Sequence, residues 1–250
     1  GIIITLSYQI LQFILNLDKQ FIAILYNTST YAVYSFAYSL LSMITTVVSA
    51  ISLVLFPVLK KLEKDTAIDF FENGEAGVIA LVSISMGVYF FLVKFVDFFL
   101  PQYHYSLVFL RILFPGLLFS SCITIIIFTY YKLLNCNSQF LAIGCGILLI
   151  SAMFNYVAWK AFNLPRAISA ASLITIIIWY FLLIGYLKIK FGIRYGRRWV
   201  GMLSIGICFY LLTQDSLHLI RGFCVYELLC IVIIFIFYRK SIMALIKKVY

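Results

Sequence analysis

Residues 106–131 read SLVFLRILFPGLLFSSCITIIIFTYY, and the only charged side chain among them is that of Arg111. A helix needs about 20 mostly apolar residues to cross the hydrocarbon core of a bilayer. This stretch therefore predicts a transmembrane helix, and other segments on either side of it have the same character. The predicted spans cover residues 2–26, 31–57, 76–98, 106–131, 139–159, 166–189, 199–213 and 219–238. The sequence thus predicts an all-α integral membrane protein with about eight transmembrane helices.

The composition of the whole chain supports the same fold class. Hydrophobic residues make up 64% of the 250 residues, charged residues make up 11%, and the mean hydropathy is +1.09. A soluble domain is about half apolar and about a quarter charged. This composition argues against a soluble enzyme, a nucleic-acid-binding module and a secreted disulfide scaffold. The six cysteines show no CxxC spacing and the chain has two histidines, so we expect neither a metal site nor a cofactor.

The net charge of +10 is mostly explained by topology. With eight spans, both termini lie on one side of the membrane, and that side receives 13 of the 19 Lys and Arg residues against 4 on the other side. Cytoplasmic loops collect Lys and Arg, so we expect both termini in the cytoplasm. The longest loop, residues 58–75, carries nearly alternating charge up to Glu75, and we expect it to form a solvated amphipathic helix along the membrane surface. The predicted outside loops are too short for a catalytic domain, which argues against an enzyme.

Asp18 and Lys19 lie inside the first predicted span. Ionisable groups at this depth normally face a bundle interior or a water-filled cavity. Neighbours on a helix point about 100° apart, so each of the two side chains needs a partner from elsewhere. Either they line a polar cavity between helices or they form structural ion pairs with other helices, and both interpretations stay open.

Arg111 is the other cation inside a span, and Pro115 follows it by one turn. Proline kinks a helix by freeing a backbone carbonyl, and kinked helices often line transport paths. The guanidinium group of arginine matches phosphate geometry, so an anionic, phosphate-bearing substrate is its natural partner. The alternative is that Arg111 extends to the membrane interface. Arg166 flanks an outer loop as an interface anchor, and Asn155 is placed to hydrogen-bond across helices.

Three longer stretches resemble a known family. In residues 17–62, an acidic–basic pair (Asp18-Lys19) ends one span, a Tyr-x-x-Ala start follows at Tyr34, and Pro57 precedes a basic loop. Residues 111–115 form an Arg-Ile-Leu-x-Pro pattern, and residues 130–159 resemble the helix pair that comes next in the family. In this order and spacing the chain resembles the Wzx-type O-antigen flippases of the multidrug/oligosaccharidyl-lipid/polysaccharide exporter superfamily.

The resemblance implies a transporter of two six-helix lobes, with residues 1–190 as the second lobe, residues 191–250 as two additional C-terminal helices with a basic tail, and a first lobe upstream of Gly1. It implies translocation of an undecaprenyl-diphosphate-linked oligosaccharide across the bacterial inner membrane by alternating access, together with polymerase and other polysaccharide-assembly proteins. Lys19 and Arg111, with Arg166 third, are the residues expected to bind the diphosphate. Asp18 and Asn155 are expected to line the same cavity.

Two other classes stay open from sequence alone. A membrane enzyme of the same pathway, such as an O-antigen polymerase or an acyltransferase, would have a similar composition but tends to carry a large outside loop. A drug or small-molecule exporter of the same superfamily usually holds a membrane-embedded acid for cation coupling, and Asp18 is compatible with that role.

Overall fold

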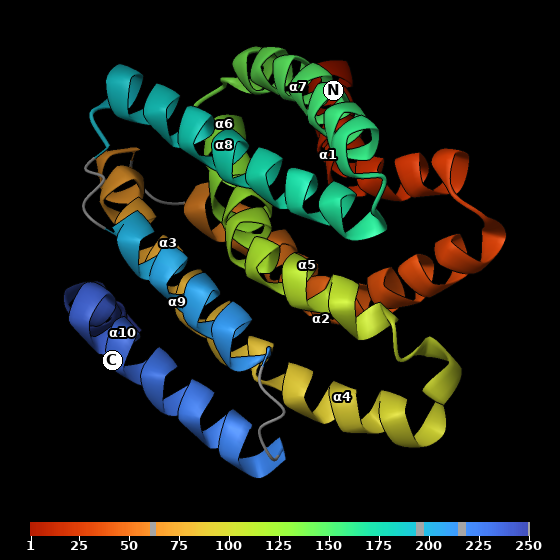
Figure 1. The fold of residues 1–250 in the computed structure, drawn as a ribbon. Helices are drawn as coiled ribbons and strands as arrows, with labels where there is room; N and C mark the ends of the chain where they lie inside the picture. Colours follow the sequence, from red (N-terminus) through yellow and green to blue (C-terminus); the bar gives the residue numbers. More distant parts are fainter. Residues whose placement is uncertain (61–63, 194–197, 215–218, 250) are drawn as a thin grey trace.

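The computed structural model describes residues 1–60, 64–193, 198–214 and 219–249, and these are helical apart from short connections (Figure 1). The prediction of an all-α membrane fold is confirmed. The elements are α1 (Ile2–Leu25), α2 (Thr28–Lys60), α3 (Lys64–Met86), α4 (Val88–Phe99), η1 (Pro101–Tyr103), α5 (Ser106–Ser121), η2 (Cys122–Ile127), α6 (Phe128–Leu133), α7 (Asn137–Phe162), α8 (Pro165–Phe191), α9 (Arg198–Leu212) and α10 (Leu219–Val249).

Each predicted span corresponds to a helix or to a stack of consecutive helical elements. Five segments of the described residues are long and apolar enough to cross a membrane: Asn73–Phe99, Ser106–Leu133, Asn137–Phe162, Pro165–Phe191 and Ile220–Ala244. Helix α9 is apolar but has 15 residues. Helix α1 is not among the five, since its 24 residues include Asp18, Lys19 and several amide side chains.

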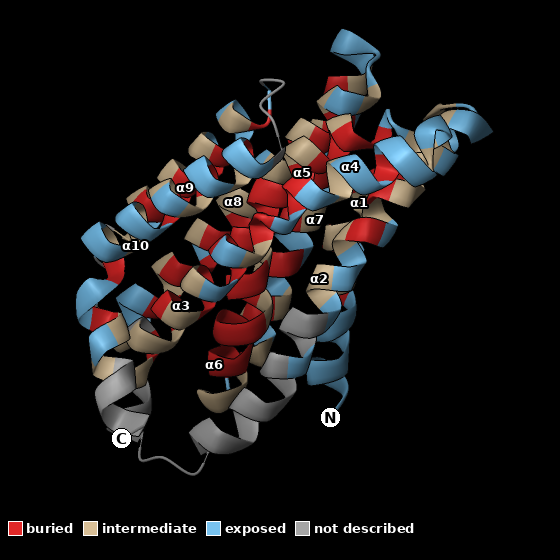
Figure 2. Cartoon of the chain, turned by 90° about the horizontal axis from the view of Figure 1, so that it is seen from below, coloured by how far each residue is buried: buried red, intermediate tan, exposed pale blue. Residues whose placement is uncertain are grey.

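The stack of α5, η2 and α6 forms the centre of the bundle. Its most apolar window is 83% buried, whereas the corresponding window of α10 is 17% buried. Helices α2, α3, α8 and α9 all pack against α5, while α7 lies on α1 and α8, and α10 lies on α3 and α9. Figure 1 shows α10 at one edge of the bundle and α7 at the other, and Figure 2 shows that α6 is largely buried. The central stack is therefore the core against which the other helices are positioned.

The helix boundaries follow local chemistry. Asn27 begins the turn into α2, because its Oδ1 accepts a hydrogen bond of 2.8 Å from the backbone N–H of Thr30. Helix α7 ends at Asn163, which has a positive φ of 48°, and Pro165 occupies the first turn of α8. Helix α8 ends at Gly192 with a φ of 64°. These stop signals place successive helices antiparallel to one another.

The charged stretch of residues 58–75 differs from the expectation of a helix along the membrane surface. Helix α2 continues to Lys60, and α3 starts at Lys64 and continues without a break to Met86. Of the charged side chains in this stretch, only that of Glu75 lies within the described residues. It is buried, and its carboxylate accepts a hydrogen bond from the hydroxyl of Tyr180 on α8. This polar partner offsets part of the cost of removing the carboxyl group from water.

Candidate functional site

Asp18 is at the centre of a buried hydrogen-bond network between α1 and α2. Its side chain is 1% exposed. The hydroxyls of Tyr34 and Tyr38 each donate to its carboxylate at 2.6 Å, and the backbone N–H of Lys19 donates at 2.7 Å. A buried carboxylate is tolerated only when donors replace its water shell. Tyr34 and Tyr38 are one helical turn apart, so both hydroxyls reach the same group.

The network continues to α7 and α8. The hydroxyl of Ser169 donates to the hydroxyl oxygen of Tyr34 at 3.3 Å. Ser172 lies near the Asp18 carboxylate, and its hydroxyl donates to Oδ1 of Asn155 at 3.4 Å. The amide nitrogen of Asn155 in turn donates to the backbone carbonyl of Ser151 at 2.9 Å. Two of the residues singled out from sequence, Asp18 and Asn155, therefore lie in one buried polar cluster to which four helices contribute.

Lys19 is not an ion-pair partner of Asp18. In the described part of the chain, no lysine or arginine nitrogen lies within 4.0 Å of the Asp18 carboxylate. Instead, Nζ of Lys19 lies 5.9 Å from the ring centroid of Tyr31, within the range of a cation–π contact. The expectation that these neighbours would point to different partners is confirmed. Of the two interpretations of Asp18, the structural ion pair is not observed among the residues that the structure describes.

A cavity of about 240 Å³ lies between α1, α2, α5, η2 and α8. Tyr38 is one of its lining residues, so the cavity adjoins the Asp18 network directly. None of the residues that line it is charged. Its polar lining consists of amides and hydroxyls, contributed by Gln12, Asn16, Tyr38, Ser42, Thr45, Ser120, Ser121 and Thr124. This lining offers both donors and acceptors without a net charge.

The wall of the cavity includes irregular backbone. Residues Cys122–Ile127 form a π-helical segment, η2, directly after α5. Such segments are rare and occur frequently at functional sites. The hydroxyl oxygen of Ser121, at the start of this irregularity, is buried and has no hydrogen-bond partner within the described residues. An unpaired buried hydroxyl is costly, so Ser121 marks an unsatisfied polar position in the wall of the cavity.

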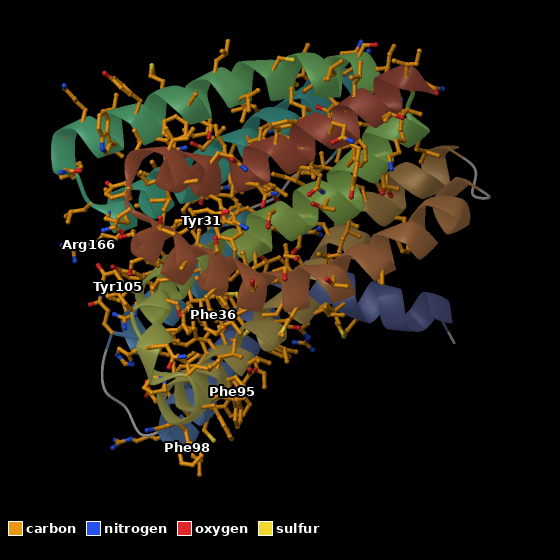
Figure 3. All side chains as sticks on the ribbon, turned by 90° about the vertical axis from the view of Figure 1, so that its right-hand side faces the viewer. Tyr31, Phe36, Phe95, Phe98, Tyr105 and Arg166 are labelled. Atoms are coloured by element: carbon orange, nitrogen blue, oxygen red, sulfur yellow. The ribbon has the colours of Figure 1, made fainter. Side chains whose placement is uncertain are left out.

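Arg111 and Arg166 do not line this cavity. Arg111 is half-buried on α5, near the hydroxyl of Tyr89 on α4. Its Nε is buried and has no hydrogen-bond partner in the described part of the chain. Arg166 is exposed near the start of α8, at the same end of the bundle as Tyr31 and Tyr105 (Figure 3). The structure therefore separates these two cations from the network of Asp18 and Asn155.

Sequence reasoning missed most of the cavity lining. Gln12 and Asn16 are one turn apart on α1, and two amides at this spacing inside an apolar helix are a signal that points to a polar face. The hydroxyls of α2 and η2 gave no comparable signal, because single serines and threonines occur throughout apolar helices. Comparisons of the chain with family models, with curated proteins and with solved structures find no match. The resemblance to O-antigen flippases therefore stays a prediction.

Proposed function

We propose that this chain is part of a membrane transporter, not an enzyme, and that it translocates an undecaprenyl-diphosphate-linked oligosaccharide across the bacterial inner membrane. Both termini would lie in the cytoplasm, as the distribution of Lys and Arg predicts. Motion would follow alternating access, in which two packed bundles rock around a site near the middle of the membrane. Polymerase and other polysaccharide-assembly proteins would act on the same substrate.

One observation carries the proposal, namely the uncharged polar lining of the cavity beside Tyr38. A sugar ring presents several hydroxyls that both donate and accept, and amide and hydroxyl side chains match that pattern. Ligand sites typically measure about 300–1,000 Å³, so a cavity of about 240 Å³ suits one portion of an oligosaccharide. A small apolar molecule would instead favour the second cavity, of about 320 Å³ between α5, α8 and α9, whose lining is almost entirely hydrophobic.

The diphosphate would be bound outside this cavity. Lys19, Arg111 and Arg166 all belong to helix segments near the end of the bundle that holds the α1–α2, α4–α5 and α7–α8 connections. Their charges would neutralise the phosphates there, with arginine contributing paired hydrogen bonds. The glycan would extend inward from that end toward Asn16 and Ser121, while the isoprenoid tail stays in the bilayer.

A second function, cation-coupled export of a small molecule, is favoured by the environment of Asp18. This carboxylate is held by phenol hydroxyls and has no basic side chain within ion-pair distance among the described residues. Without a fixed positive partner, such a group can take up a proton or a monovalent cation. In both proposed functions Asp18 would be the group that couples transport to an ion, and only the transported substrate would differ.

Reconstitution separates the two proposals. The purified chain is placed in vesicles with a lipid-linked oligosaccharide that carries a fluorophore on the glycan, and an impermeant quencher is added outside. If the chain flips the substrate, the quencher removes the inner-leaflet signal as well as the outer-leaflet signal. Equal quenching in vesicles with and without protein would contradict flipping. Gradient-driven accumulation of a cationic dye in the same vesicles would favour the exporter.

A further inference from the structure

The membrane-spanning segment Asn73–Phe99 is interrupted near its middle, at Gly87. Helix α3 ends at Met86 and α4 begins at Val88. The backbone N–H of Gly87 bonds to the carbonyl of Ile84 at 3.0 Å, three residues back, and the N–H of Phe90 bonds to the carbonyl of Gly87 at 3.2 Å. In a continuous α-helix each N–H would bond to the carbonyl four residues back. This interruption, which we call the Gly87 break, leaves the carbonyl of Ser83 without its regular partner.

Helix α10 supplies the missing partner. The hydroxyl of Tyr226 donates to the carbonyl oxygen of Ser83 at 2.7 Å, and the Tyr226 side chain is fully buried. In the apolar interior of a membrane protein an unpaired backbone carbonyl costs several kcal/mol. The phenol group therefore compensates for the broken turn, and it ties α10 to the last residues of α3.

Glu227, the next residue on α10, fits against the Gly87 break itself. A Cβ atom added to Gly87 would lie 2.1 Å from Oε1 of Glu227, so any larger residue at this position would have to displace the end of the Glu227 side chain. Oε1 is buried and has no hydrogen-bond partner within the described residues. The ring of Phe223 lies over the same position, 3.0 Å from that added atom. Three neighbouring residues of α10 thus converge on one interruption in the helix opposite.

Beyond the break, the last turns of α4 are lightly packed. Phe91, Phe95, Phe98 and Phe99 are exposed to the surroundings of the bundle, whereas Tyr89 and Phe90 near the break are buried. Segments with few buried contacts have a low free-energy cost of local motion. The outer part of α4 therefore has a breakpoint at its base, while its tip is held by few contacts, chiefly the buried Val96 and the bond between Asp97 and His104.

We infer that Gly87 is a hinge about which α4 swings relative to α3, and that α10 holds this hinge in one position through Tyr226 and Glu227. The hinge would let one half of a transmembrane segment move while the other half stays packed in the core. This inference concerns the motion of the bundle and does not depend on which substrate is transported.

Spin-label distances test the hinge. Labels at Phe98→Cys and Ile220→Cys report on the exposed tip of α4 against the start of α10. Labels at Leu81→Cys and Ile236→Cys report on α3 against α10 below the break, again at exposed positions. The background replaces the accessible native cysteines by serine, namely Cys145, Cys208 and Cys224.

We expect Tyr226→Phe to broaden and lengthen the distance distribution of the tip pair while leaving the lower pair unchanged. Tyr238→Phe is the matched control, since this buried tyrosine of the same helix donates to the carbonyl of Arg198 on α9 instead. It should leave the tip pair as in the wild type. An unchanged tip pair in Tyr226→Phe, or an equal change in both pairs, would overturn the hinge.

A second pair of variants gives an answer even if Tyr226→Phe does not fold. Gly87→Ala places a methyl group where Oε1 of Glu227 lies, so the Glu227 carboxyl group must swing away from the break, and the tip distance should lengthen as this contact with α10 is disturbed. The double variant Gly87→Ala with Glu227→Ala removes the clash and keeps the bond from Tyr226 to Ser83, so it should restore the wild-type distance. Identical distributions for the single and double variants would contradict the role of Glu227.

Discussion

The hydroxyl of Tyr38 lies 2.6 Å from both carboxylate oxygens of Asp18, and the same side chain lines the uncharged cavity. Tyr38 is thus the physical link between the buried carboxylate and the space where a substrate would bind. A ligand hydroxyl that bonds to Tyr38 would compete for the proton that Tyr38 donates to Asp18. Substrate occupancy and the state of Asp18 are therefore expected to influence each other, as reciprocal coupling requires.

Tyr34→Phe should destabilise the protein. The substitution removes one donor to the buried carboxylate of Asp18, and hydrogen bonds to charged groups contribute about 1.5–3 kcal/mol. We expect a clear fall in the thermal unfolding midpoint of the purified protein in detergent. Tyr156→Phe is the control, because Tyr156 is exposed on α7. Equal midpoints for the two variants would show that Asp18 does not rely on Tyr34.

Asp18→Asn should uncouple transport from an ion gradient. The amide has nearly the shape of the carboxyl group and can keep a bond from Tyr38, but it cannot exchange a proton or attract a cation. Flipping is measured in vesicles with and without an imposed proton or sodium gradient. We expect the gradient to accelerate the wild-type protein and to have no effect on the variant. A variant that still responds to the gradient would place coupling elsewhere.

Lys19→Gln and Arg111→Gln should each weaken binding of undecaprenyl diphosphate that carries no sugar. Loss of one charge-assisted hydrogen bond costs about 1.5–3 kcal/mol, and about 1.4 kcal/mol corresponds to a tenfold change in affinity. Lys160→Gln serves as the control, since Lys160 is exposed at the end of α7. If all three variants bind the lipid equally well, the phosphate-binding role of Lys19 and Arg111 is wrong.

Two glycines of α7 should respond oppositely to the same substitution. An added Cβ at Gly144 would lie 3.0 Å from Cγ2 of Ile10 on α1, whereas nothing lies within 4 Å at Gly146. Gly144→Leu should therefore force α1 and α7 apart and cost about 1–3 kcal/mol, as overpacking typically does. Gly146→Leu should leave stability unchanged or raise it slightly, because leucine is the better helix former. The thermal unfolding midpoints of both variants test this prediction. An equal loss of stability in the two variants would contradict the close contact between α1 and α7 at Gly144.

The existence and approximate ends of the helices were predictable from sequence, because long apolar segments bounded by polar turns have few alternatives in a membrane. The small residues of α7 differ in their surroundings, because Gly144 packs closely against α1 whereas Gly146 faces outward. Sequence alone does not fix which side of α7 meets α1.

The polar partners were harder to predict. Asp18 was recognised as a buried group, but its donors, Tyr34 and Tyr38, could not be distinguished from the many tyrosines that serve as interfacial residues in membrane proteins. Glu75 was read as solvated because it ends a run of charges, yet it is buried against Tyr180. Arg111 lies on the side of α5 that faces Tyr89 on α4, and helical periodicity alone does not orient one helix against its neighbours.

The central claim is that the uncharged cavity receives the glycan, and the flipping rate of cavity variants tests it most directly. Asn16→Leu and Ser121→Ala alter two polar groups of the lining, and Gln9→Leu changes an exposed amide of the same helix as Asn16 that is not among the lining residues. In vesicles with the fluorescent lipid-linked oligosaccharide, we predict at least about a tenfold slower rate for Asn16→Leu combined with Ser121→Ala, equivalent to about 1.4 kcal/mol of lost interaction. Gln9→Leu should retain the wild-type rate. A wild-type rate in the combined cavity variant would contradict the claim.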